Sequence, residues 1–187
     1  MRCGDCRYLY RRSNSSKGRR ALSAEFDAIF DANKAYADAY KSSELTGRAA
    51  QGLAIVTCMD SRIDPLCVVG MKPGDVKILR NAGARVTDDV LRTLILATYL
   101  LNVKRVLVMP HTDCRMASGT EEQVHKAIFD ASGVDTRSIE IRTVTDQKAV
   151  LESDVMRIKT YPLLPEDLEV VGAIFDVKSG KLLPLIN

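Results

Sequence analysis

Two short segments of the sequence carry residues that could bind a metal ion and activate water. Cys58, Asp60 and Arg62 stand in the first segment, and His111 and Cys114 stand in the second. Two thiols and one imidazole are the donor set that zinc prefers. Three protein ligands leave one position of a tetrahedral ion open, which is typical of catalytic rather than structural zinc. The residue types therefore predict a catalytic zinc centre on the two cysteines and the histidine.

Each part of this pattern also has a simpler interpretation. A single buried cysteine is usually a small apolar residue, and one His-x-x-Cys pair arises by chance. Asp60 and Arg62 alone would more often form an ordinary salt bridge. Metal binding is favoured because these residues occur in combination, directly after two apolar segments.

The segments that precede the reactive residues have the pattern of buried strands. Residues 52–58 and 105–110 are short, continuous apolar runs with β-branched members, which is typical of a strand covered on both faces. Residues 76–79 form another such run. In parallel α/β sheets, ligands bind beyond the carboxyl ends of the strands, and the reactive residues would lie there.

Helical patterns alternate with these strands. Apolar residues at three- and four-residue steps predict a helix over residues 23–41, with Ser23 as its N-cap. Thr87, followed by two acidic residues, predicts the start of a helix that continues to Leu101. The rest of the chain shows two more helical patterns and two strands around a turn, over residues 118–131, 146–160, 168–177 and 182–185. The alternation predicts an α/β fold with a mainly parallel central sheet flanked by helices.

Composition and charge disfavour several classes of protein. With 46% hydrophobic and 27% charged residues the chain is ordinary for a globular protein, and no apolar run reaches the ~18 residues of a membrane span. Residues 1–20 hold seven of the 27 basic residues and one of the 24 acidic ones, leaving 20 basic and 23 acidic residues and a net charge of −3. We therefore predict no nucleic-acid partner and no membrane partner.

Residues 1–21 are predicted to be a basic, disordered tail outside a single domain of residues 22–187. A tail without function, a basic contact arm and an organelle-targeting presequence are the alternatives for it. Cys3 and Cys6 form a C-x-x-C pair in this tail, but a closed structural zinc site would need a second pair. Three of the five cysteines are assigned to metal, so we expect a reducing compartment, the cytoplasm, rather than a disulfide scaffold.

Together the two reactive motifs resemble the signature of the β-class carbonic anhydrases, in the compact branch of that family. The motifs are Cys-Met-Asp-Ser-Arg at residues 58–62 and His-Thr-Asp-Cys at residues 111–114. The resemblance continues through residues 78–85 and 171–180. It implies a zinc ion on the three predicted ligands, and reversible hydration of carbon dioxide to bicarbonate and a proton by zinc-bound hydroxide.

The same resemblance implies roles for the residues around the metal. Asp60, paired with Arg62, would accept a hydrogen bond from the hydroxide and orient it toward carbon dioxide. The resemblance also suggests a hypothesis for inactivation: if its bond to Arg62 breaks, Asp60 could swing onto the zinc and displace the water. Ser61, Asn81 and Gly83 are expected to line the substrate pocket, although Gly83 could equally serve a tight turn.

Family resemblance also bears on partners and on substrate access. Relatives are at least dimers, so we expect a homodimer or a higher homo-oligomer in which the helix over 23–41 packs on a partner subunit. The alternative is that this helix packs within its own chain. Arg115 departs from the family pattern, in which glycine usually follows the last ligand. A bulky cation there could narrow the substrate entrance, bind an anion or point to solvent.

Two other functions fit the same residues. Hydrolysis of carbonyl sulfide or carbon disulfide would use the same zinc site, and the relative turnover of the three gases distinguishes these activities. A non-catalytic zinc-binding protein is the second alternative. It is disfavoured because a structural site has no need of a carboxylate oriented by Arg62.

Overall fold

The computed structural model describes residues 24–185 of the chain. The chain divides into two compact units, residues 1–45 and 46–187. The described part of the first unit holds one helix, α1, over Ala24–Asp38. This helix ends earlier than the predicted Lys41, in a tight turn closed by the bond from Ala39 N–H to the carbonyl of Tyr36. The predicted cap Ser23 and the basic tail lie outside the described residues.

The apolar stripe of α1 is exposed over its length. Phe26 and Tyr36 are 55% and 60% exposed, and Ile29 and Phe30 are exposed to a similar degree. The stripe has the spacing that the sequence predicts. That it packs on a partner subunit stays a prediction.

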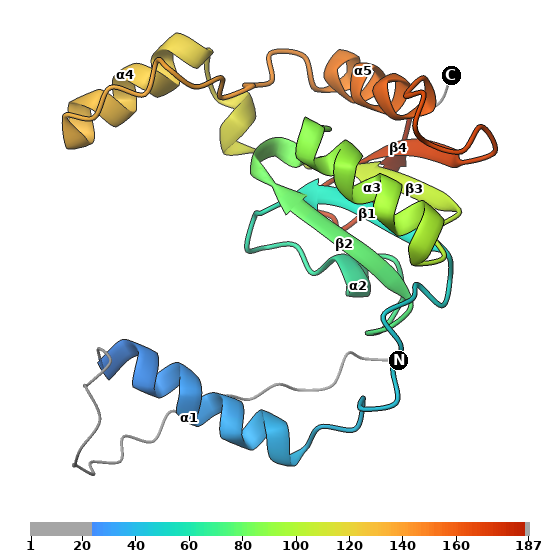
Figure 1. The fold of residues 1–187 in the computed structure, drawn as a ribbon. Helices are drawn as coiled ribbons and strands as arrows, with labels where there is room; N and C mark the ends of the chain where they lie inside the picture. The colour runs from blue at the N-terminus through green and yellow to red at the C-terminus, as the bar shows by residue number, and fades with distance from the viewer. Residues whose placement is uncertain (1–23, 186–187) are drawn as a thin grey trace. The chain divides into compact units, whose positions relative to one another are not determined.

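The second unit is built on a five-stranded sheet in the order β2-β1-β3-β4-β5. Figure 1 labels the strands β1 to β4 of this sheet. The first four strands in this order are parallel, and the last pair, β4 and β5, is antiparallel. The strand bounds are Leu53–Cys58 for β1, Val76–Asn81 for β2, Arg105–Met109 for β3, Glu169–Phe175 for β4 and Leu182–Pro184 for β5. The predicted α/β class with a mainly parallel sheet is confirmed.

Helices and short 3₁₀ turns connect these strands. Their bounds are Pro65–Val68 for α2, Asp88–Leu100 for α3, Glu121–Ser132 for α4, Gln147–Lys159 for α5, Ala82–Ala84 for η1 and Arg115–Ala117 for η2. Thr87 caps α3 as predicted, because its hydroxyl accepts the N–H of Val90 at 3.4 Å. The four-residue helix α2 was not predicted, since one turn is too short to show a helical period. No helix among the described residues is long and apolar enough to cross a membrane.

The two faces of the sheet bury different sets of side chains. Helices α3 and α5 pack on one face, where Leu91, Leu94, Leu151 and Ile158 meet alternate residues of the strands. The opposite face packs against the segment around α2, and Ile55 is at its centre. Continuous apolar strands are therefore explained by burial on both faces, as the sequence predicts.

The close approach of α5 to the sheet depends on Gly172 in β4. A Cβ atom at Gly172 would lie 2.9 Å from Cγ of Leu151 and 3.1 Å from Cγ2 of Val155, both buried. Gly172→Ala is therefore expected to lower the free energy of unfolding by about 1–3 kcal/mol, because the core has no room for the methyl group. Urea denaturation measures this as a lower midpoint at unchanged slope. Gly47→Ala is the control, since a Cβ there meets nothing within 4 Å; equal midpoints for the two variants would contradict the prediction.

Strand order determines where a site can form. The chain leaves β1 for β2 on one side and later enters β3 on the other side of β1. Connections from the carboxyl ends of β1 and β3 therefore diverge and leave a crevice between them. Cys58 ends β1, and the segment after β3 begins with Pro110 and His111.

Candidate metal centre

Cys58, His111 and Cys114 meet at the carboxyl ends of β1 and β3. One potential ligand atom from each residue lies within 4.8 Å of the other two. The two sulfur atoms are 4.0 Å apart, although the cysteines are 56 positions apart in the sequence. All three side chains are buried, and His111 is 0% exposed. The structure thus brings the three predicted ligands together.

The donor atoms of this cluster fit a soft or borderline divalent cation. Nδ1 of His111 lies 2.8 Å from the carbonyl of Thr112. Because a carbonyl only accepts, Nδ1 carries the proton, and Nε2 presents its lone pair. Nε2 is buried and has no hydrogen-bond partner among the described residues, as expected of an atom that binds a metal. Burial raises the pKa of the Cys114 thiol, and the neighbouring Cys58 raises it further. A bound cation would oppose this shift, because it stabilises the thiolate.

Asp60 lies beside the cluster and is held by Arg62 in a two-point contact. Arg62 donates from Nε to Oδ1 of Asp60 at 2.9 Å and from Nη2 to Oδ2 at 2.8 Å, and its backbone N–H donates to Oδ1 at 2.9 Å. Oδ2 of Asp60 lies 3.7 Å from Nε2 of His111. These hydrogen bonds from Arg62 hold the pKa of Asp60 well below its usual range. The carboxylate is therefore ionised, oriented and directed to the edge of the cluster.

Arg62 is itself fixed by the segment that carries His111 and Cys114, the other two candidate ligands. Its Nη1 donates to Oδ2 of Asp113 at 2.7 Å, and its Nη2 donates to the carbonyl of Asp113 at 3.0 Å. Asp60 and Asp113 together raise the pKa of the guanidinium. Sequence reasoning did not single out Asp113, although it stands directly before Cys114. Arg62 therefore links the two ligand-bearing segments.

Two further backbone contacts support the ligands. The N–H of Gly83 donates to Sγ of Cys58 at 3.4 Å, which withdraws electron density from the sulfur. Gly83 has a φ of 80°, and a Cβ there would lie 3.2 Å from Met116, so glycine suits the position in two ways. Gln147, at the start of α5, donates from Nε2 to the carbonyl of His111 at 2.6 Å. Gln147 could not be predicted from sequence, because this contact joins segments 36 positions apart.

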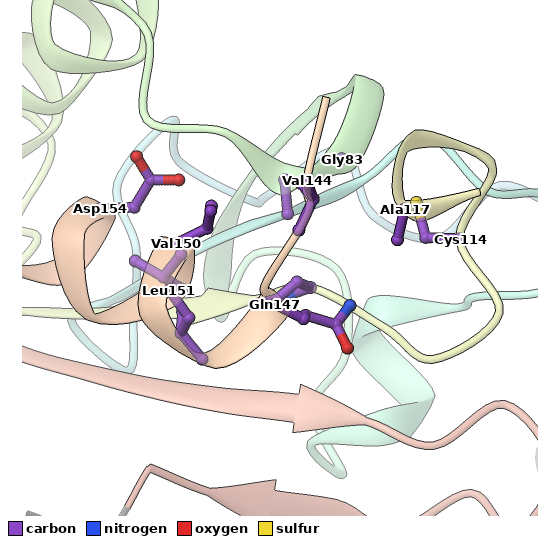
Figure 2. Close-up of a pocket in the computed structure, with 11 residues that line it drawn as sticks. Gly83, Cys114, Ala117, Val144, Gln147, Val150, Leu151 and Asp154 are labelled. Carbon is purple, nitrogen blue, oxygen red and sulfur yellow. The ribbon is translucent and has the colours of Figure 1, made fainter. Parts of the chain in front are cut away.

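A small cavity lies behind Cys114, on the side of α5 (Figure 2). It is bordered by Cys114 and Ala117 on one side and by Val150 of α5 on the other, with Gly83 and Val144 between them. Its volume of about 10 Å³ is the room that one water molecule needs. Neither Asp60 nor His111 borders the cavity, so it lies apart from the edge of the cluster where the carboxylate stands.

The remaining residues singled out in the sequence take different positions. Ser61 lies exposed in the turn between Asp60 and Arg62. The side-chain amide of Asn81 donates to the carbonyl of Arg85 at 2.7 Å and accepts its N–H at 2.8 Å, which closes the turn around Gly83. Arg115 is exposed on η2 and donates to the hydroxyl of Ser118 at 3.3 Å.

Comparison with known proteins gives one consistent family. A family model described as carbonic anhydrase matches residues 53–182. The chain is 35% identical over 151 residues to beta-carbonic anhydrase 1 of Mycobacterium tuberculosis, covering 80% of this chain and 91% of that protein. A carbon disulfide hydrolase of an Acidianus species is 29% identical over 154 residues, covering 70% of this chain and 75% of that enzyme.

Solved structures agree with the sequence comparisons. The crystal structure of a carbonic anhydrase from Streptococcus mutans superposes with a TM-score of 0.82 at 35% sequence identity. The match covers 89% of this chain and 100% of the Streptococcus mutans chain. The fold, the matched segment and the identity over most of the chain all agree with the resemblance stated for residues 58–62 and 111–114. The chain belongs to the β-carbonic anhydrase family of enzymes.

Proposed function

We propose that this protein is a zinc enzyme that hydrates carbon dioxide to bicarbonate and a proton. Cys58, His111 and Cys114 would hold the zinc. The observation that carries the proposal is the buried Nε2 of His111, which has no hydrogen-bond partner in residues 24–185, faces two thiols and lies 3.7 Å from an ionised carboxylate. A bound zinc ion would supply a Lewis acid that lowers the pKa of water, so that hydroxide forms near neutral pH.

The residues of the chain would orient the reaction. The low pKa of Asp60 keeps it a hydrogen-bond acceptor at working pH, and Arg62 fixes both of its oxygens. An acceptor so placed can fix the orientation of the attacking water with respect to the carbon of the substrate, and good orientation lowers the barrier without covalent catalysis. Thr112, through its carbonyl, holds the tautomer of His111 that a metal requires. The product proton leaves to solvent or buffer.

We assign less direct roles to the three predicted pocket residues. Gly83 supports the pocket by its N–H bond to the sulfur of Cys58. Asn81 would shape the pocket indirectly, by closing the turn that contains Gly83. Its side-chain N–H and oxygen are both bonded to the backbone of Arg85. Ser61 is proposed to face the substrate entrance because it is exposed between Asp60 and Arg62.

Stopped-flow hydration of carbon dioxide, followed with a pH indicator from about pH 7 to 9, tests the proposal. The protein must first be assayed for its zinc content. We expect fast turnover by preparations that hold one zinc per chain, in proportion to the zinc bound. Absence of turnover at every pH in zinc-loaded protein would contradict the proposal.

Hydrolysis of carbon disulfide or carbonyl sulfide is the second candidate function. It is favoured by one observation, the similarity to a carbon disulfide hydrolase over 70% of this chain. We expect carbon dioxide to be turned over at least 10-fold faster than either sulfur gas at equal concentration, since the more similar relatives carry the carbonic anhydrase name. Sulfide release faster than bicarbonate formation would reverse the assignment.

We further propose that residues 22–187 work as one functional domain and that the protein is a homodimer or a higher homo-oligomer. The exposed side chains of Phe26, Ile29, Phe30 and Tyr36 on α1 support a subunit contact, because neighbouring exposed apolar side chains are typical of surfaces that bind another protein. Light scattering on the full chain measures the assembly. The cytoplasmic location stays a prediction.

A further inference from the structure

Arg80, the fifth residue of β2, donates to three backbone carbonyls of the segment that follows β1. Its Nε lies 2.9 Å from the carbonyl oxygen of Cys58, its Nη2 2.6 Å from that of Asp60, and its Nη1 3.2 Å from that of Ile63. The planar guanidinium, with its fixed set of N–H donors, is suited to bind several acceptors at once. Arg62 holds the side chain of Asp60, whereas Arg80 holds its backbone.

We propose that Arg80 is a positioning residue, which sets where the Asp60 carboxylate stands relative to the metal ligands. The inference rests on the proposed function, because it assigns Arg80 to the same site and the same reaction. Arg80 would not touch substrate. It would act through the backbone carbonyl of Asp60 itself and through those of Cys58 and Ile63 before and after it.

Apart from Arg80, the backbone in the middle of this segment is held by a tight turn, in which the N–H of Ile63 donates to the carbonyl of Asp60 at 3.2 Å. The N–H of Met59 donates to the carbonyl of Asn81 at 2.9 Å, and the buried side chain of Ile63 anchors the other end. Between these two points, Ser61 and Arg62 are exposed, so packing does little to fix the backbone there. Without Arg80, the carbonyl of Asp60 loses its shorter, charge-assisted hydrogen bond and keeps the longer one from the N–H of Ile63. Its peptide group could then rotate and carry the carboxylate with it.

Metal binding has independent support and should survive the loss of Arg80. Cys58 lies within β1, and its register partner in β2 is Asn81. Gly83 donates to its sulfur. The other two ligands, His111 and Cys114, come from the segment after β3. Arg80 is therefore placed to affect the rate of the reaction and not the occupancy of the metal.

The variants Arg80→Ala and Arg80→Lys test the proposal in the zinc-loaded protein. We expect each to retain one zinc per chain, with kcat about 10²-fold lower for alanine and about 10-fold lower for lysine, since a displacement of about 1 Å costs rates of this order. Lysine keeps the charge but lacks the planar set of donors. Added guanidinium ion should restore several-fold of the lost rate in Arg80→Ala and none in wild type, an effect that general destabilisation would not produce.

Arg105→Ala is the matched control. Arg105 also donates to a carbonyl, from Nη2 to Gln51 at 2.8 Å, but at the opposite end of the sheet. We expect this variant to keep the wild-type rate. An Arg80→Ala protein with the wild-type rate overturns the proposal, and so does a rate that falls only in proportion to lost zinc.

A second readout separates this inference from the proposed function. Amide hydrogen exchange at Met59, Arg62 and Ile63 reports how firmly the segment is held, whether or not the enzyme turns over. We expect faster exchange at these amides in Arg80→Ala and unchanged exchange in Arg105→Ala. If zinc-loaded wild type fails to hydrate carbon dioxide, the proposed function is wrong, while unchanged exchange in Arg80→Ala overturns the positioning role itself.

Discussion

Replacing Cys114 by serine is expected to abolish zinc binding and carbon dioxide hydration together. The sulfur of Cys114 is buried 4.0 Å from that of Cys58, and a serine hydroxyl is a poor replacement for a thiolate on zinc. Loss of partners that only support a ligand already costs roughly 10–100-fold in affinity, so loss of a ligand should cost more than this. Zinc content after dialysis and the rate of hydration measure the two effects.

Thermal unfolding gives an independent measure of the same variant. A ligand that binds only the folded state raises the unfolding temperature by mass action. Added zinc should therefore stabilise the metal-free wild type and leave Cys114→Ser nearly unchanged. Cys67→Ser is the control, because Cys67 is exposed on α2 and stands outside the cluster. If the Cys114→Ser protein keeps one zinc and the wild-type rate, Cys114 is not a zinc ligand.

Asp60→Asn is expected to lower the rate of hydration without releasing zinc. The variant keeps the size of the side chain but loses its charge, and the amide cannot accept two donors from Arg62 as the carboxylate does. We expect zinc to stay bound while kcat/KM falls by roughly 10²-fold or more, because the orienting acceptor is lost. Steady-state hydration rates and metal analysis of the same preparation make the comparison.

The chain offers a close control for this substitution. Asp135 and Arg137, in the turn after α4, repeat the contact of Asp60 and Arg62 with the same spacing and the same atoms. Arg137 donates from Nε to Oδ1 at 3.0 Å and from Nη2 to Oδ2 at 2.6 Å. Asp135→Asn should leave the hydration rate unchanged. Loss of zinc in Asp60→Asn would show instead that Asp60 helps to hold the metal.

These two pairs also show what the sequence could and could not predict. Both have the pattern Asp-x-Arg, and hydrogen bonds from the arginine lower the pKa of the aspartate in each case. Local spacing therefore determines the contact between the two side chains. It does not determine whether the pair lies beside the cluster of Cys58, His111 and Cys114, which depends on the strand that ends at Cys58.

Elements with a strong local signal were predicted well. Residues 52–58 and 105–110 were expected as strands because burial on both faces requires continuous apolar runs, and the structure confirms them. β2 extends two residues beyond the predicted end at Leu79. Backbone pairing continues through Arg80 and Asn81, opposite Thr57 and Cys58, and pairing makes no demand on side-chain polarity. The predicted end of β2 rests on hydrophobicity alone. The apolar run ends at Leu79, although the backbone hydrogen bonds continue for two more residues.

Contacts between distant segments had no sequence signal of their own. The bond from Arg80 to Asp60, the bond from Gln147 to His111 and the bond from Arg62 to Asp113 all join residues at least 20 positions apart. Each involves a common polar residue with many possible partners. The three candidate ligands could be picked out in the sequence because cysteine and histidine have few alternative roles, whereas the residues that surround them are specified by the fold.

Sheet topology has a consequence for the order in which the site is completed during synthesis. All three ligands and the strands β1, β2 and β3 are made by residue 114, before any of α5 or β4 exists. The backbone after β3 is secured only later, when Gln147 binds the carbonyl of His111 and Phe175 accepts the N–H of Thr112 at 2.9 Å. A nascent chain thus holds the complete donor set for dozens of residues before His111 is fixed in place. We therefore expect the proposed zinc to bind tightly to the finished polypeptide and not to the emerging one.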